Sequence, residues 1–141
     1  MSFFISALRR RAIAVTGLAA LLSGCAVGIQ SGGDFPSVSY TVARPYQDVY
    51  HRAQDQADQC LRGKNQFKVR TRLDAAGQSG MVSVYGPLGG AEVARTEFTA
   101  VDARHTQVVQ TVWGRAPWDQ NALQAMRESV LIDTSVCVAY K

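Results

Sequence analysis

Apolar residues recur at steps of three and four along residues 46–61, and this spacing predicts an amphipathic helix. The repeat consists of Tyr46, Val49, Tyr50, Ala53, Ala57, Cys60 and Leu61. The positions between them are mostly Gln, Asp and Arg, which suit a solvent-facing side. Pro45 stands where a helix can begin, and Gly63 is a natural stop after the last turn.

Alternation of side chains with a period of two predicts strands on both sides of this helix. Residues 37–43 (SVSYTVA) alternate and are rich in β-branched residues, and residues 66–73 (QFKVRTRL) alternate cleanly. Residues 81–85, 91–101 and 106–113 are three further predicted strands. The alternation of residues 91–101 is imperfect, which indicates room for a β-bulge there.

The C-terminal part has a weaker helical pattern. Residues 118–130 predict a second helix, because their apolar positions again fall at helical spacing. This apolar stripe consists of Leu123, Met126 and Val130. The tail at residues 134–140 (TSVCVAY) has the β-branched content of a strand, but Cys137 continues the stripe two turns later. We predict that the tail is also helical.

The order of these elements is strand, helix, four strands and helix. Short turns connect the last four strands, so neighbouring strands are expected to be antiparallel. Two helices with apolar stripes need a common surface to cover. We therefore predict an α+β fold in which an antiparallel sheet has both helices packed on one face.

The N-terminal stretch has a different pattern, a basic cluster followed by an apolar run. Arg9, Arg10 and Arg11 precede 11 residues, 12–22, that carry no charge. As a helix this run would be about 16 Å long, roughly half the thickness of a bilayer's hydrocarbon core. It is too short to span a membrane and has the form of the apolar region of a secretory signal peptide.

The run ends in Leu22-Ser23-Gly24-Cys25, which resembles the lipobox of bacterial lipoproteins at all four positions. The resemblance implies that residues 1–24 are a signal peptide and that Cys25 becomes the acylated first residue of the mature chain. In proteobacterial lipoproteins, an Asp after this cysteine usually retains the protein in the inner membrane. Ala26 stands there instead, so the resemblance implies an outer-membrane anchor on a protein that faces the periplasm.

The lipobox also divides the chain into parts. Residues 25–34 (CAVGIQSGGD) contain three glycines and no periodicity, and we expect an acylated cysteine followed by a flexible tether. Residues 35–141 are long enough for a single α+β domain with a modest core. The element order and compartment loosely resemble the helix-grip arrangement in domains of some outer-membrane lipoproteins, including accessory subunits of the β-barrel assembly machinery.

The net charge changes once the signal peptide is removed. The full chain has 15 basic and 11 acidic residues, a formal net charge of +4. Three of the arginines lie in residues 1–24, which contain no acidic residue, so 12 basic residues remain and the net charge is +1. The basic character belongs mainly to the removed segment and does not indicate nucleic-acid binding.

Two cysteines, Cys60 and Cys137, remain when Cys25 is acylated. An even pair in an exported protein predicts a disulfide bond. Neither cysteine belongs to a C-x-x-C motif, and no histidine lies near either one at ligand spacing. We therefore expect no redox role and no metal site at these positions.

The two histidines offer little for catalysis. His51 lies beside the apolar stripe of the first helix, with Asp48 and Asp55 within side-chain reach, and His105 lies in a turn. A general base needs a nucleophile and an orienting acid beside it, so a solvated helix face is the simpler interpretation of His51. No G-x-S-x-G, H-E-x-x-H or P-loop motif occurs. We expect a non-enzymatic protein without a cofactor.

Two surface features are candidates for binding a partner. Lys68, Arg70 and Arg72 line one side of the strand at residues 66–73 and can meet anionic lipid headgroups, a cell-wall polymer or an acidic protein. The same row also suits a solvated face, or an edge strand where lysine discourages further pairing. Trp113 and Trp118 bracket a strand-to-helix corner where they can stack on a sugar or anchor a partner, although tryptophans there more often cap a core.

Two hypotheses of function follow. The first is a membrane-anchored, non-enzymatic binding or assembly module whose partner is an envelope protein, which predicts a filled core and an exposed basic or apolar patch. The second is a carrier of a small apolar ligand or lipid, which predicts a roomy apolar cavity between the sheet and the helices.

Overall fold

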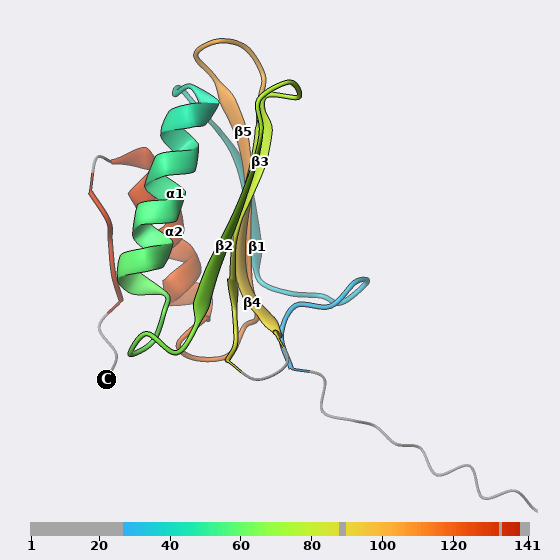
Figure 1. The fold of residues 1–141 in the computed structure, drawn as a ribbon, viewed down its shortest axis with the longest axis vertical. Coiled ribbons are helices and arrows are strands. Elements are labelled where there is room, and N and C mark those ends of the chain that lie inside the picture. The colour runs from blue at the N-terminus through green and yellow to red at the C-terminus, as the bar shows by residue number, and fades with distance from the viewer. Residues whose placement is uncertain (1–26, 88–89, 133, 139–141) are drawn as a thin grey trace, which may run out of the picture.

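The computed structural model describes residues 27–87, 90–132 and 134–138. Its elements in chain order are β1 (Ser37–Val42), α1 (Tyr46–Cys60), β2 (Lys68–Asp74), β3 (Ser79–Tyr85), β4 (Glu92–Ala100), β5 (Thr106–Val112) and α2 (Gln120–Leu131). All five strands form one antiparallel sheet, and both helices lie on one side of it (Figure 1). The predicted α+β fold is confirmed.

The strand order is β1-β5-β4-β3-β2, so the two strands that flank α1 in the sequence form opposite edges of the sheet. From β2 the strands follow one another across the sheet in chain order until β5 lies beside β1. Ser37 then faces Thr111, and Val42 faces Thr106. This closing pair joins residues about 70 positions apart in the chain, which makes the fold depend on long-range contacts.

The core lies between the helices and one face of the sheet, which we call the covered face. Alternation places every second strand residue on this face, and the apolar stripes of both helices pack against it. The central buried residues are Val82, Val84, Phe98, Val108 and Val112 from the sheet, Val49, Ala53 and Ala57 from α1, and Leu123, Met126 and Val130 from α2.

One large polar residue, Gln110, is fully buried on the covered face. Its side-chain oxygen accepts a hydrogen bond from the Tyr40 hydroxyl at 3.1 Å, and its amide nitrogen donates to Thr96 Oγ1 at 3.4 Å. Burial raises the pKa of Tyr40 above an ordinary value that already keeps the phenol a donor at neutral pH. Pairing of buried polar groups is required because an unpaired one costs stability.

The predicted β-bulge is present where β4 begins. Val84 faces Ala94, but the next residue, Tyr85, faces Glu92, which leaves Val93 without a partner on β3. Val93 is buried, and its carbonyl accepts the backbone N–H of Trp113. The bulge shifts the alternation of β4 by one residue, which is the physical reason for its imperfect pattern.

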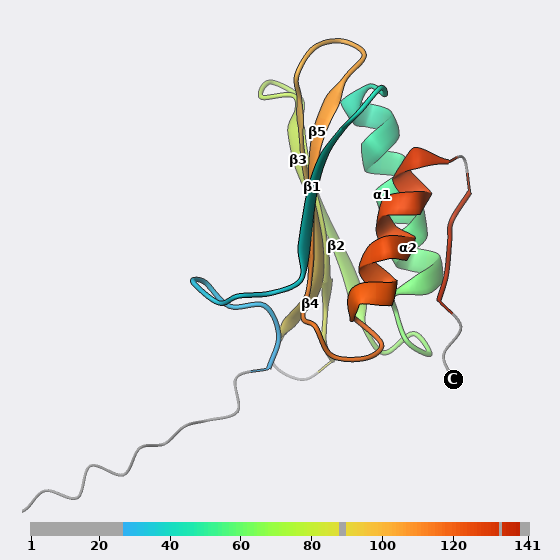
Figure 2. The same cartoon turned by 180° about the vertical axis from the view of Figure 1, so that it is seen from behind.

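The two helices run in opposite directions (Figures 1 and 2). Trp118, just before α2, donates to the Leu61 carbonyl just after α1, while Arg44 before α1 donates to the Leu131 carbonyl at the end of α2. Asp119 caps α2 by accepting from the backbone N–H groups of Asn121 and Ala122.

The prediction that the C-terminal tail is helical was wrong for its described residues, 134–138. α2 ends at Leu131, and Ile132 already has an extended backbone. The tail then runs back along the helix layer, and Gln56 of α1 donates a hydrogen bond to the Val136 carbonyl. A helix continued beyond Leu131 would have carried Cys137 away from Cys60, because α2 ends at the opposite end of the layer from that cysteine.

The returning tail forms the predicted disulfide bond between Cys60 and Cys137, with 5.0 Å between their Cα atoms. Cys60 is buried at the end of α1, and Cys137 is exposed. The bond joins residues 77 positions apart and fastens the tail across both helices.

Candidate functional site

The face of the sheet opposite the helices, which we call the open face, carries the predicted basic row. In the described part of the chain, only the segment before β1 lies on this side (Figure 2). The strand register assigns its side chains, which are mostly hydroxyl, amide and charged groups. They include Ser37, Ser39 and Thr41 of β1, Gln107, Val109 and Thr111 of β5, Arg95, Glu97 and Thr99 of β4, Met81 and Ser83 of β3, and the three basic residues of β2.

Lys68, Arg70 and Arg72 are all exposed on β2, an edge strand. Their row is about 13 Å long, because alternate strand residues are about 6.7 Å apart. The guanidinium of Arg70 lies 4.6 Å from the centre of the Tyr85 ring. The intervening residue Thr71 accepts a hydrogen bond from Tyr50 of α1, which shows that the basic side chains point away from the helices.

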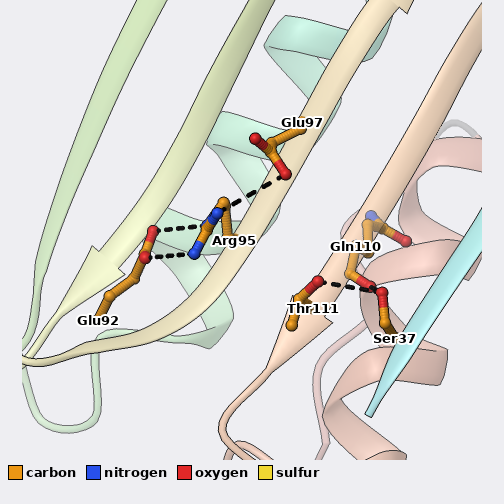
Figure 3. Close-up of polar contacts among 6 residues, drawn as sticks. All are labelled: Ser37, Glu92, Arg95, Glu97, Gln110 and Thr111. Carbon is orange, nitrogen blue, oxygen red and sulfur yellow. Dashed lines mark hydrogen bonds and ion pairs between the residues drawn. The ribbon is translucent and has the colours of Figure 1, made fainter. Parts of the chain in front are cut away.

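Arg95 lies at the centre of the open face and was not predicted (Figure 3). It donates two hydrogen bonds to the Glu92 carboxylate, at 2.8 and 3.0 Å, and its third nitrogen is 3.8 Å from Glu97. The bulge at Val93 breaks the alternation before Arg95, so the sequence does not show which face this side chain occupies. A carboxylate three residues before an arginine was the only local signal.

Ser83 lies between the two arginines on neighbouring strands, opposite Arg70 on one side and Arg95 on the other. It is fully buried although it is on the open face, and its hydroxyl oxygen has no hydrogen-bond partner among the described residues. Neighbouring side chains therefore cover this part of the open face.

A groove of about 340 Å³ separates the open face from the segment that precedes β1. Its lining includes Gly32, Phe35, Ser37, Arg95 and Thr111. Ser37 anchors this side of the sheet, because its hydroxyl donates to the Gln110 carbonyl at 2.9 Å and lies 3.1 Å from the Thr111 hydroxyl (Figure 3).

The two tryptophans have different environments. Trp118 is only 6% exposed, and its ring centre lies 4.1 Å from that of Phe67. It therefore belongs to the core and offers no ring to a partner. Trp113 is half-buried against the core, and the guanidinium of Arg115 lies 5.6 Å from its ring centre. Of the predicted tryptophan pair, only Trp113 reaches the surface.

A larger pocket, of about 470 Å³, lies where α1 ends and α2 begins. Its lining includes Leu61, Pro117, Ala122, Ala125 and Val138. The returning tail forms one wall. The space between the sheet and the helices, where the carrier hypothesis predicted a cavity, is filled by the buried core side chains instead.

The histidines line neither the groove nor the larger pocket. His51 is exposed on α1, with its ring centre 5.2 Å from that of Tyr50. His105 is exposed in the turn between β4 and β5, where its Nδ1 is 2.9 Å from Asp102. Backbone and side-chain hydrogen bonds, the one from Arg104 foremost, lower the pKa of Asp102. The hydrogen bonds of Asp102 to Arg104 and His105 stabilise this turn.

The predictions about the lipid anchor and about metal sites can be compared with the structure only for the residues that it describes. Cys25 and residues 1–24 lie outside the described residues. Within the described ranges, no helix has the length and apolar content needed to cross a membrane, and no group of three or more Cys, His, Asp or Glu side chains converges as metal ligands would.

Comparison of the chain with protein-family models, curated proteins and solved structures gives no significant match.

Proposed function

We propose that the chain is an outer-membrane-anchored periplasmic lipoprotein that acts as a non-enzymatic binding or assembly module, with the open face as its contact surface. The observation that carries the proposal is the row of exposed cations on β2, which points away from the helix layer. The lipobox at Leu22–Cys25 supports the anchor.

The chemistry of the open face suits a reversible contact with an acidic partner. Arg70 and Arg72 are exposed, and arginine is enriched at protein interfaces because its planar group forms several hydrogen bonds at once. Stacking on Tyr85 restrains Arg70, which lowers the entropy that it would lose on binding. The partner that fits this row presents carboxylates.

An anchor strengthens such weak contacts. A protein confined to a thin layer beside one membrane meets partners in that layer at a raised effective concentration. Electrostatic complementarity then increases the association rate and makes binding sensitive to salt. Under these conditions a row of three basic residues is sufficient for a weak, reversible contact with a partner.

Two measurements test the anchor. Mass spectrometry of the native protein should find an acylated Cys25 at the mature N-terminus, and Cys25→Ala should release the protein from the membrane fraction. A mature protein that retains residues 1–24 would overturn the lipoprotein assignment.

Affinity capture from solubilised envelope, with the lipid anchor intact, tests the contact surface. Replacing Lys68, Arg70 and Arg72 with Glu should weaken partner capture and reduce its sensitivity to salt. Arg72→Glu alone can be compared with Arg104→Glu, which makes the same change in charge at an exposed turn outside the row. Equal capture by these two variants would show that the row is not the contact surface.

The pocket at the helix ends supports the alternative, a carrier of a small apolar ligand or lipid. Its volume of about 470 Å³ falls in the range of ligand pockets, and its lining is largely apolar. A fluorescent apolar probe should bind the protein, and Ala125→Phe should abolish binding by filling the pocket. If the probe does not bind, or binds this variant equally well, the carrier function is wrong.

A further inference from the structure

The segment after the predicted lipidation site is attached to the sheet almost at once. The backbone N–H of Ile29 donates to the Glu92 carbonyl at 2.7 Å, at the point where β4 begins. At its other end the segment joins β1, where the Pro36 carbonyl accepts from Val112. Within the tether expected for residues 25–34, the described residues 27–34 are therefore bonded to the sheet at Ile29.

Gly28 makes the attachment specific. It is buried, and its φ of 88° lies in the left-handed region that favours glycine. A Cβ atom at this position would lie 2.5 Å from the Glu92 carbonyl oxygen and 3.2 Å from Ala91 Cβ. Any larger residue would have to separate the segment from the start of β4.

The attachment leaves very little free chain between the anchor and the domain. Only Ala26 and Val27 separate Cys25 from Gly28. Three Cα–Cα steps of 3.8 Å allow at most about 11 Å between Cys25 and Gly28. The end of the sheet that holds Gly28 must therefore lie close to whatever holds Cys25.

This anchor-proximal end is made of residues 61–67, 86–87, 90–91 and 113–119, together with the start of the segment (Figure 1). Lys64 and Arg115 are exposed in these loops, and Lys68 is exposed where β2 begins. Arg62 is also here, half-buried, with its side chain donating to the Phe67 carbonyl.

Four acidic residues lie at the same end, and two of them are already engaged. Glu92 is paired with Arg95, and Asp119 caps the start of α2. Asp34 and, in the last turn of α1, Asp58 are exposed. Neither Lys64 nor Lys68 makes an ion pair with any described residue, so the exposed cations Lys64, Lys68 and Arg115 outnumber the two exposed carboxylates of the anchor-proximal end.

The opposite end, formed by the turns at residues 43–45, 74–79 and 100–106, has a different character. It exposes the carboxylates of Asp74 and Asp102, and hydrogen bonds hold the pKa of Asp102 below its ordinary value. Arg104 and, two residues before Asp74, Arg72 are exposed cations of this end, and Asp48 in the first turn of α1 adds a third exposed carboxylate. An anionic membrane surface would favour the anchor-proximal end over this one.

We propose that the acylated Cys25 holds the anchor-proximal end against the bilayer, with Lys64, Lys68 and Arg115 in contact with anionic lipid headgroups. This inference rests on the proposed lipid anchor. The sheet then stands on the membrane, and the opposite end lies about 30 Å further out, since the nine residues of β4 each rise about 3.3 Å. The open face stays accessible to a partner from the side.

The test uses the intact lipoprotein reconstituted into phosphatidylglycerol vesicles that contain a headgroup-attached quencher. A fluorophore is placed on Lys64→Cys at the anchor-proximal end or, in a matched variant, on Ala103→Cys at the opposite end. Quenching of the first label should be several-fold stronger than quenching of the second. Equal quenching would overturn the orientation.

Two changes to the segment test whether its short attachment sets the orientation of the domain on the membrane. An insertion of about ten Gly and Ser residues between Ala26 and Val27 keeps Gly28 in place but adds a reach of roughly 17 Å. Gly28→Val should instead detach the segment from β4. Both changes should bring the quenching ratio of the two labels toward one, and the insertion does so without disturbing the folded domain. An unchanged ratio in the insertion variant would show that the short segment does not set the orientation.

The remaining outcomes separate the anchor from the orientation. Protein that fails to float with the vesicles would overturn the anchor, and the orientation with it. Flotation with equal quenching would overturn the orientation alone. The ratio should fall in vesicles of zwitterionic lipid or at high salt, and an unchanged ratio would mean that Lys64, Lys68 and Arg115 make no headgroup contact.

Discussion

The two faces of the sheet use the same strands for different purposes, and β5 shows this most clearly. Its alternate residues Thr106, Val108, Gln110 and Val112 are buried under the helices, while those between them are half-buried on the open face. On β5 the covered face nevertheless includes two polar residues, Thr106 and Gln110, and the open face includes Val109. Polarity alone therefore does not tell the faces apart.

What distinguishes the faces is how their polar groups are satisfied. Gln110 on the covered face is bonded to Tyr40 and Thr96, because water cannot reach it. On the open face, the basic side chains of β2 remain free to meet solvent or a partner. The covered face should therefore determine stability, and the open face should determine binding.

The largest effect should come from removing an aromatic ring from the covered face. Phe98 is 2% exposed, and Phe98→Ala should lower the free energy of unfolding by about 3–5 kcal/mol through lost burial and a cavity. Thr99 is its exposed neighbour on the open face, and Thr99→Ala should change stability by less than about 0.5 kcal/mol. Denaturant unfolding measures the loss of stability in both variants. Equal losses would contradict the distinction between the two faces.

The disulfide bond should have the next largest effect, because it fastens the tail over the helix layer. Its loop of 77 positions predicts a loss of about 2–4 kcal/mol on reduction, with an entropic upper value near 4.5 kcal/mol. Denaturant unfolding with and without reductant gives this difference. The Cys60→Ala, Cys137→Ala double variant is the control and should not respond to reductant. Finding both thiols free in oxidised protein would contradict the bond itself.

The buried polar pair should have an intermediate effect. Gln110→Leu should cost about 1–3 kcal/mol, because the Tyr40 hydroxyl loses its acceptor while it remains partly buried. Adding Tyr40→Phe should recover part of this loss, so the double variant should be less destabilised than the sum of the single ones. Strict additivity in a double-mutant cycle would show that the two side chains are not coupled.

The smallest effect on stability should come from the basic row. Arg72→Glu should change the free energy of unfolding by no more than about 0.5 kcal/mol, since the side chain is exposed. Arg70→Glu should cost slightly more, about 0.5–1 kcal/mol, because it also removes the contact with the Tyr85 ring. Thermal unfolding checks both. A large loss would mean that the row serves the fold and would remove the distinction between the faces.

Local sequence was sufficient for the elements and their order. Helix α1 followed from the spacing of its apolar residues, and the strands followed from alternation and from the turns between them. Imperfect alternation even indicated the bulge near Val93. These signals are readable because each depends on residues a few positions apart, where backbone geometry sets which side chains share a face. The pair of cysteines likewise predicted the bond, since only two remained available.

The candidate site needed the tertiary structure. Arg95 escaped prediction because its face depends on the bulge and on pairing with β3. Trp118 joined the core because Phe67, distant in the chain, packs on its ring. The tail was expected to be helical because its spacing continued that of α2, but its path is set by the attachment of Cys137 to Cys60.

The N-terminal segment also has features that local sequence predicts and features that only the tertiary structure decides. Its sequence, with three glycines and no periodicity, is typical of a tether. Only the folded sheet presents the Glu92 carbonyl that Ile29 binds and the confined space that Gly28 fills. Periodicity is a local property of the chain, whereas strand register, the cover over a face and the docking of a segment depend on residues that folding alone brings together.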